Sequence, residues 1–458
     1  MKRSIIKMPW HMLPVIITLA WPTMLEQLMQ TAVQYIDTAM VGSLGTEATA
    51  AVGATTTVNW LVGSTISALG VGFLAFISQS DGAGDRESVK KASAQSVLVT
   101  LVAGLFLTVL ILSISPFVPA LMQVEEEIQP LAARYFFILY TPILARTASI
   151  IFGTVLRAAG DTKTPMLIGV VVNIVNVVLN FLLIYPSRYI SVFGQEVFVL
   201  GADWGVVGAA VASAIAFAVG GILIFISLWR HPRLSPKGQS LKPDKNILLP
   251  CLKIAFPNAL QRFGTSLGYV FFAAMVNSLG SVATAAHTIA NTVESAFYIP
   301  GYGMQTAAAT LAGNAVGSND RKKLSDLSGM ILFIEVALMI LSGGILFIFA
   351  PHMVSLFSKD LQVIALGAVV LRMVALSEPF YGVSIIIEGM MQGMGRTAMP
   401  FVTNIIGMWL IRIVGTYIST QLLGYGLVSA WACMIAHNMM LFAVFMIFRL
   451  SKRWNPIK

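Results

Sequence analysis

Four polar side chains in the first half of the sequence could bind a cation. Asp37 lies in the apolar stretch "AVQYIDTAMVG", Asn176 and Asn180 lie in "NIVNVVLN", and Ser213 lies in "GAAVASAIAF". Carboxylate, amide and hydroxyl oxygens are ligands that hard cations prefer. Removal from water also disfavours the charged form of a carboxylate, so a buried acid can exchange a proton near physiological pH. The residue types therefore predict a site for a proton, with sodium as the alternative.

The predicted depths of these side chains in a membrane support one shared site. At about 1.5 Å per residue, Asp37 lies roughly 8 Å and Ser213 roughly 12 Å below the outer ends of their helices. Asn176 and Asn180 lie roughly 15 and 9 Å down, on one helix face together with Asn173. Asn173 is deeper and is expected only to hydrogen-bond a neighbouring helix. The alternative for Asp37 is a fixed structural acid, but we expect no basic residue of this half at its depth to neutralise it.

The composition is that of a membrane protein. Of 458 residues, 57% are hydrophobic and 11% are charged, against roughly 25% charged residues in a soluble protein. Cys251 and Cys433 lack the CxxC spacing of a metal or redox site, and no nucleotide-binding or hydrolase motif is present. We therefore expect no enzyme, cofactor or metal centre. The net charge of +9 is spread over short loops, which does not indicate nucleic-acid binding.

The apolar runs predict twelve membrane-spanning helices in an all-α fold. Each is long enough to cross a hydrocarbon core of about 30 Å. They cover residues 13–41, 48–79, 92–122, 128–156, 165–186, 204–229, 247–276, 283–314, 325–355, 361–391, 400–422 and 425–448.

The distribution of basic residues predicts how the chain crosses the membrane. With a cytoplasmic N-terminus carrying Lys2, Arg3 and Lys7, most of the 29 basic residues fall on the cytoplasmic side. The outer loops hold acidic segments such as "VEEE" at 124–127. This positive-inside bias predicts a multi-pass protein of the cell (plasma or inner) membrane with both termini in the cytoplasm.

The second half of the chain repeats the first. "SLGTEATAA" at 43 recurs as "SLGSVATAA" at 278, an offset of 235 residues that also aligns Pro165 with Pro400. Because each copy has an even number of spans, both have the same orientation, an arrangement typical of secondary transporters. We predict a first six-helix lobe at 1–228, a cytoplasmic linker at 229–246 and a second lobe at 247–458.

The two copies differ in their charges. Phe272 stands at the position equivalent to Asp37. The second copy instead has its own charged residues within apolar runs: Arg262, Glu294, Glu378, Glu388 and Arg412. They are expected either to form static ion pairs, each arginine with an acid partner, or to contact substrate or protons. Further candidates for a substrate cleft are Glu26, Gln27 and Gln34, and helix bends are predicted at Pro22 and Pro257.

The chain resembles a known transporter family along essentially its whole length. The motifs "YIDTAMVGSLGTEATAAVG", "QSDGAGDRESVKKA", "LRAAGDTKTPM", "NVVLN" and "GVVGAAVASAI" are similar to those of multidrug and toxic compound extrusion (MATE) transporters. The resemblance implies two six-helix lobes around a V-shaped cleft. It also implies cation-coupled export of diverse, often cationic small molecules.

The resemblance extends to individual residues of the predicted site. The family's acid in the first span matches Asp37, its polar pair in the fifth matches Asn176 and Asn180, and its hydroxyl in the sixth matches Ser213. Some members have an acid in place of Asn180, a difference that favours protons over sodium here. Other members have coupling acids in the second lobe, where this chain has Thr265 and Tyr381.

Together these features predict a secondary antiporter that works by alternating access. It would act as a monomer in membrane lipid and exchange protons, or sodium, for its substrates. The rival hypothesis is a flippase for lipid-linked saccharides of the same superfamily. Twelve spans without an extra pair, and no clear row of arginines for a pyrophosphate, argue against the flippase. A passive channel or receptor is a third hypothesis, which the duplication and the acid cluster do not favour.

Overall fold

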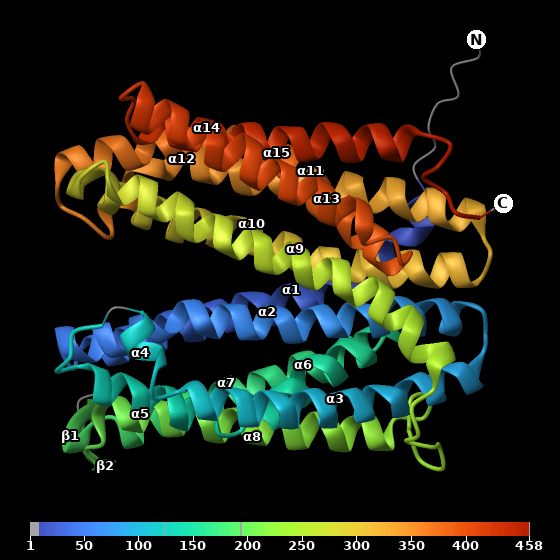
Figure 1. Ribbon diagram of the computed structural model, residues 1–458, viewed down its shortest axis with the longest axis horizontal. Helices are drawn as coiled ribbons and strands as arrows, with labels where there is room; N and C mark the ends of the chain where they lie inside the picture. The colour runs from blue at the N-terminus through green and yellow to red at the C-terminus, as the bar shows by residue number, and fades with distance from the viewer. Residues whose placement is uncertain (1–8, 123, 193–194, 458) are drawn as a thin grey trace. The chain divides into compact units, whose positions relative to one another are not determined.

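The protein is almost entirely helical (Figure 1). This computed structural model describes residues 9–122, 124–192 and 195–457; Lys2, Arg3 and Lys7 lie outside the described residues. The helices form two compact units, each drawn from separate stretches of the chain. Unit 1 comprises residues 1–27, 74–86 and 249–458, and unit 2 comprises 28–73 and 87–248. The boundary between the units passes through the first two helices, and the predicted lobes at 1–228 and 247–458 remain a prediction from the repeat.

The elements of the first half of the chain correspond to the first six predicted spans. They are the 3-10 turn η1 (Trp10–Met12), α1 (Leu13–Gly42), α2 (Thr46–Gly82), α3 (Arg86–Ile114), α4 (Val118–Leu121), α5 (Gln129–Tyr140), α6 (Ile143–Ala158), α7 (Lys163–Leu183), β1 (Pro186–Val192), β2 (Gln195–Ala202) and α8 (Gly205–Arg230). The fourth span is broken before Pro142 into α5 and α6, which meet at 49°. Proline removes a backbone hydrogen bond, so a break is expected there.

The elements of the second half correspond to the last six spans. They are α9 (Lys245–Asn277), α10 (Ser281–Gly317), α11 (Arg321–Ser355), α12 (Leu361–Gly393), α13 (Ala398–Ile406), the π-helical segment η2 (Gly407–Ile413), α14 (Val414–Thr416), the π-helical segment η3 (Tyr417–Leu422) and α15 (Leu427–Leu450). Aspartates cap two of these helices: Asp320 accepts from the Lys323 amide at 2.8 Å, and Asp360 from the Gln362 amide at 2.7 Å.

The predicted all-α membrane fold is confirmed in outline. Among the described residues, nine helices are long and apolar enough to cross a membrane, and the α5–α6 pair makes a tenth span. The remaining two predicted spans are the long helices α9 and α10. Pro22 lies within the continuous helix α1 and Pro257 within α9. The bends expected at these prolines remain predictions.

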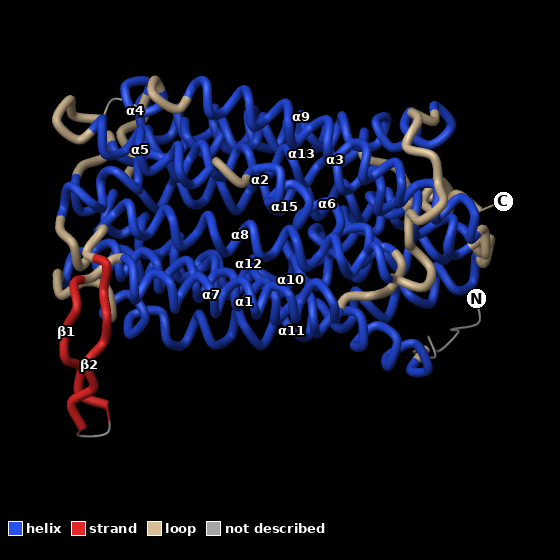
Figure 2. The backbone as a smooth tube through the Cα atoms, turned by 90° about the horizontal axis from the view of Figure 1, so that it is seen from below, coloured by secondary structure: helices blue, strands red, loops and turns tan. Residues whose placement is uncertain are grey.

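Between the fifth and sixth predicted spans the structure has a β-hairpin, which the apolar runs did not predict. β1 and β2 pair antiparallel, with Tyr189 opposite Phe198 and Arg188 opposite Val199. Figure 2 shows the hairpin in red at one end of the helices, extending across their direction. It directly joins α7 to α8, the helices that carry Asn176, Asn180 and Ser213.

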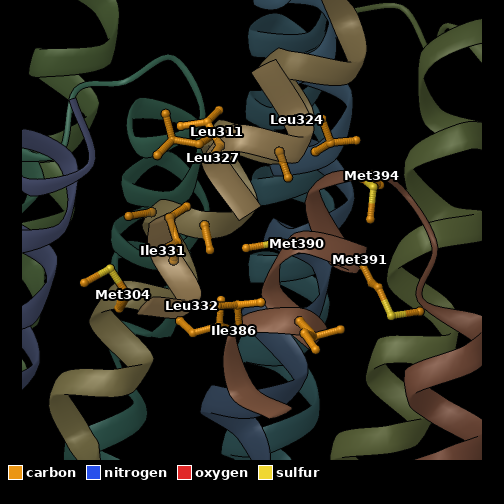
Figure 3. Packing of buried hydrophobic residues seen from close by; sticks show 14 of the residues in the cluster. Met304, Leu311, Leu324, Leu327, Ile331, Leu332, Ile386, Met390, Met391 and Met394 are labelled. Atoms are coloured by element: carbon orange, nitrogen blue, oxygen red, sulfur yellow. The ribbon is translucent and has the colours of Figure 1, made fainter. Parts of the chain in front are cut away.

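Unit 1 is organised around the packing of α10, α11 and α12. Leucine, isoleucine and methionine side chains from these helices form a buried cluster that includes Met304, Ile331 and Met390 (Figure 3). Small residues allow the helices to approach closely: a Cβ on Gly393 of α12 would overlap the Ala309 carbonyl of α10. The burial of this apolar surface holds α10, α11 and α12 together, and these helices carry the buried acids Glu294, Glu335 and Glu378.

Candidate functional site

The four polar residues predicted in the first half form one hydrogen-bond network in unit 2. Asn180 Nδ2 donates to Asp37 Oδ1 at 2.6 Å and to Asn176 Oδ1 at 3.2 Å. Asn176 in turn lies 3.0 Å from Ser213 Oγ. Asn176 and Asn180 are 6% and 1% exposed, while Asp37 and Ser213 are half-buried. Three helices, α1, α7 and α8, thus join their polar side chains at one point.

Helix geometry explains why α7 supplies two of these side chains. Asn176 and Asn180 are four residues apart, so they lie one above the other on one helix face. That face packs towards α8 at a point where glycine permits close approach, because a Cβ on Gly208 would overlap the Leu183 carbonyl. The Asn180 amide donates two hydrogen bonds, and its buried Oδ1 has no partner in the described part of the chain.

The Asn176 amide fits this network in two orientations. In one, Nδ2 donates to Ser213 Oγ at 3.0 Å and Oδ1 accepts from Asn180. In the other, the nitrogen faces Asp37, 2.8 Å from Oδ1 and 3.3 Å from Oδ2, and the amide oxygen accepts from Ser213 Oγ at 3.0 Å. This orientation gives up the hydrogen bond from Asn180, because the two amide nitrogens then lie 3.2 Å apart. Only the second orientation offers Asp37 an additional donor. An ionised carboxylate needs donors, whereas a protonated one is itself a donor.

Arg146 of α6 is a polar residue near this network that the sequence analysis did not single out. Its guanidinium donates to Asn59 Oδ1 at 2.6 Å and lies 5.0 Å from the Phe217 ring centre. Tyr135 is within electrostatic range of both Arg146 and Asp37. Within the described ranges, however, no ion pair of 4.0 Å or less joins Arg146 to Asp37. A lone arginine in "ILARTASIIFG" was the signal that could have identified it.

In unit 1, Glu388 of α12 is surrounded by amide donors. Gln261 donates to Glu388 Oε1 at 2.8 Å and Gln392 at 3.2 Å, while Asn404 donates to Oε2 at 3.2 Å. These donors come from α9, α12 and α13. Three converging N–H groups complement a carboxylate and fix its position.

The two candidate arginines of unit 1, Arg262 and Arg412, do not form the close ion pairs that were expected. Arg262 Nε donates to Asn258 Oδ1 at 3.0 Å. Arg412, which is 4% exposed, lies over the rings of Phe272 and Tyr269 at 4.3 and 4.8 Å. Neither has a carboxylate within 4.0 Å in the described ranges. Among the described residues, no acid is therefore in ion-pair contact with either arginine, although Glu388 and Glu294 lie near enough to interact electrostatically with Arg262 and Arg412, respectively. Amide and aromatic groups, which also stabilise a guanidinium, occupy the positions where a carboxylate was expected.

The other predicted acids of the second half, Glu294 and Glu378, are also buried. Glu294 and Glu378 are 5% and 1% exposed, and neither Glu378 oxygen has a hydrogen-bond partner in the described part of the chain. Glu335 of α11, which the sequence analysis missed, is fully buried in the same way. Its Oε1 would lie 2.7 Å from a Cβ on Gly301 and 3.0 Å from one on Gly382. A lone acid in "LFIEVALM" gives the same sequence signal as Asp37.

The remaining cleft candidates lie on α1. Glu26 and Gln27 are half-buried and belong to unit 1, whereas Gln34 is exposed and belongs to unit 2. Pro22 is buried and Thr23, next to it, donates to the Gly303 carbonyl at 2.8 Å. α1 therefore carries residues of both units.

Comparison with known proteins agrees with this architecture. A model of the MatE family matches residues 22–182 and 257–418, one stretch in each half. The chain is 28% identical over 441 residues to a probable multidrug resistance protein NorM of Thermotoga maritima, covering 96% of this chain and 92% of that protein. It is 24% identical to a probable multidrug resistance protein YoeA of Bacillus subtilis, covering 90% and 87% of the two chains.

A solved structure shows the same fold. It is described as the outward-facing conformation of a multidrug resistance MATE family transporter of the MOP superfamily. Its TM-score is 0.87 at 24% identity, with 97% of this chain and 96% of the other covered.

Proposed function

The chain belongs to the multidrug and toxic compound extrusion (MatE) family of membrane transporters, and on this premise we propose that it is a proton-coupled antiporter with Asp37 as the coupling acid. Its substrates would be diverse, often cationic small molecules, exported by alternating access. It would act as a monomer in the cell membrane, with both termini in the cytoplasm. The observation that carries the proposal is the network of Asp37 with Asn180, Asn176 and Ser213.

The orientation of the Asn176 amide would depend on whether Asp37 is protonated. When Asp37 is ionised, the Asn176 nitrogen can donate to it and Ser213 can donate to the Asn176 oxygen. When Asp37 is protonated, its hydroxyl can donate to the Asn176 oxygen and the Asn176 nitrogen can donate to Ser213. A hydrogen bond joins Asn176 and Ser213 in both arrangements, but the donor differs: Ser213 donates when Asp37 is ionised, and Asn176 donates when Asp37 is protonated. One proton on α1 would therefore reverse a hydrogen bond between α7 and α8.

Protonation would also change what the site offers a substrate. An ionised Asp37 attracts a cationic compound, while a neutral one does not, so proton and substrate compete. A neutral acid also costs less to keep in a low-dielectric environment during the return of the carrier. We propose that uptake of a proton at Asp37 releases the substrate and that α1, through a bend at Pro22, links this event to the rest of the chain.

The choice of proton over sodium rests on charge. Asp37 is the single formal negative charge among the four network residues, because Asn180 is neutral. A sodium site would gain from a second carboxylate, since sodium is a hard cation that keeps its charge when bound. Protonation needs only one acid. Sodium therefore stands as the alternative coupling ion at the same residues.

Efflux measurements would test this proposal. Purified protein in proteoliposomes would be loaded with a fluorescent organic cation, and proton and sodium gradients would be imposed separately. We expect a proton gradient to drive export and a sodium gradient of equal size to have no effect. Export driven by sodium alone would refute proton coupling, and no export with either gradient would refute antiport of this class of substrate.

A further inference from the structure

The β1–β2 hairpin exposes a concentration of apolar side chains. Tyr189, Phe198 and Leu200 are 67%, 52% and 72% exposed, and Val197 is 45% exposed. The Tyr189 and Phe198 rings face each other across the strands with centres 5.2 Å apart. A two-stranded ribbon is at most marginally stable alone in water, and its open apolar edges favour aggregation. Exposure of these apolar side chains to water is unfavourable, so we expect them to contact another apolar surface.

The attachment points of the hairpin place its base at a membrane surface. α7 has 21 residues, so it is about 32 Å long, close to the roughly 30 Å of the hydrocarbon core. β1 begins three residues after α7 ends, and α8 begins three residues after β2 ends. Both flanking helices are apolar enough to span the membrane. The base of the hairpin therefore lies where hydrocarbon meets headgroups.

The direction of the hairpin keeps it near that surface. In Figure 2 the strands leave the ends of the helices and run across the helix direction, and not onward along it. A ribbon that crosses the helix direction lies along the membrane surface, because the helices cross the membrane. Its whole length, and not only its base, is therefore available to the interface.

The side chains around the base are those typical of a membrane interface. Trp204, just before α8, is 52% exposed. Tyr185, just after α7, hydrogen-bonds Ser43 Oγ at 2.9 Å. Arg188 lies over the rings of Phe181 and Tyr185 at 4.4 and 4.3 Å. Tryptophan and tyrosine collect at headgroup level, and arginine reaches from apolar surface to polar headgroups.

We propose that the hairpin is an interfacial anchor that inserts Tyr189, Phe198 and Leu200 among the lipid headgroups and upper acyl chains. The exposed carboxylate of Glu196, on the same strand face as Phe198, fits the headgroup region and excludes insertion into the hydrocarbon core. The bound surface is lipid and not a second protein. If the termini are cytoplasmic, as proposed above, this is the outer leaflet. The anchor holds the ends of α7 and α8, but it does not depend on which ion is coupled.

Site-directed spin labelling in proteoliposomes can test the anchor. The background would carry Cys251→Ala and Cys433→Ala, which removes both native cysteines. Single cysteines would then be placed by Phe198→Cys, Leu200→Cys and Tyr189→Cys, which lie on one face of the hairpin. Lys237→Cys, an exposed position in the linker, serves as the water control. Ile174→Cys, which is 57% exposed in the middle of α7, serves as the hydrocarbon control.

Collision rates with oxygen and with a water-soluble nickel chelate distinguish the possible surroundings. For labels at 198 and 200 we expect a nickel rate several-fold below that at 237 and an oxygen rate between those of the two controls. A nickel rate equal to that at 237 would place the hairpin in water. Low rates with both reagents would indicate burial against protein, such as a second copy. Either result would overturn the proposal. The label at 189, opposite position 198 on the same face, supplies the measurement if a variant at 198 or 200 fails to fold.

Discussion

Asp37 and Phe272 occupy equivalent positions of the internal repeat, but the first position carries an acid and the second lies beside a buried arginine. Asp37 is held by the Asn180 amide at 2.6 Å. Phe272 packs under the Arg412 guanidinium at 4.3 Å. The repeat offset also pairs Asn180 with Gly415, which has no side chain to donate a hydrogen bond. A cation would be attracted at the first position and repelled at the second.

This difference shows that the duplicated helices kept their fold while their chemistry diverged. The second half does contain buried carboxylates, but in different roles. Glu388 accepts from three amides, whereas Asp37 has one fixed donor in Asn180 and a second contact, with Asn176, that depends on how the amide is turned. A fully hydrogen-bonded carboxylate has little to gain from a proton. We therefore expect Glu388 to support stability and Asp37 to support coupling.

The largest expected effect comes from Glu388→Ala. It would leave the donors of Gln261, Gln392 and Asn404 without their acceptor inside unit 1. Unsatisfied buried donors cost about 1–3 kcal/mol each, so for three donors we expect a loss of at least about 3 kcal/mol in the free energy of unfolding. Thermal unfolding in detergent would measure it. Glu388→Gln is the matched control, because its carbonyl can still accept; equal losses in both variants would contradict the role assigned to the three amides.

The second effect is on transport by Asp37→Asn. The variant keeps the size of the side chain and a hydrogen bond with Asn180, but it cannot be ionised. Hydrogen bonds to a charged group contribute about 1.5–3 kcal/mol, so we expect proton-driven export to fall roughly 10- to 150-fold with little change in thermal stability. Initial rates of efflux from proteoliposomes would measure it. Undiminished proton-driven export would contradict the coupling role.

A third prediction is a variant in which sodium also drives transport. Asn180→Asp would place a second carboxylate beside Asp37, where the amide now donates at 2.6 Å. Two adjacent acids cannot both ionise without a cation between them. We expect sodium to become a driving ion and the sodium-driven rate to rise about tenfold, which corresponds to about 1.4 kcal/mol. The initial rate of efflux under a sodium gradient would measure this effect. A variant driven only by protons would contradict the claim that a second carboxylate favours sodium.

The smallest effect is expected from Ser213→Ala. Loss of the single contact with Asn176 removes about 0.5–1.5 kcal/mol, so proton-driven export should fall about 2- to 10-fold. Ser227→Ala is the matched control on the same helix, since that hydroxyl only donates to the Leu223 carbonyl at 2.9 Å. Equal rates for the two variants would remove Ser213 from the network.

Much of the fold could be predicted because a membrane span has a simple sequence signal. Long apolar runs gave the positions of most helices within a few residues, such as α1 at Leu13–Gly42 and α15 at Leu427–Leu450. The third run, predicted at 92–122, is the exception, because α3 ends at Ile114 and the short α4 follows it. The break between α5 and α6 and the π-helical segments η2 and η3 escaped prediction, because they change local geometry without shortening the apolar run. The hairpin was also missed, although aromatic and β-branched residues in "YISVFGQEVFVL" favour strands.

The candidate site could be predicted in part. Depth along a helix and the spacing of Asn176 and Asn180 are readable from sequence, and the structure places both with Asp37 and Ser213 in one network. Rotation about each helix axis is not readable in this way. The partners of Glu388 and the rings under Arg412 therefore could not be foreseen, because they depend on which faces of α9, α12 and α13 meet.

Proton release on substrate binding tests the central claim most directly. A cationic substrate would be added to purified protein in weakly buffered detergent solution, and the pH change would be followed with an indicator dye. If the substrate displaces a proton from Asp37, the wild-type protein and Glu388→Gln should both release protons, while Asp37→Asn should bind substrate and release none. Equal proton release from Asp37→Asn and the wild type would contradict the account.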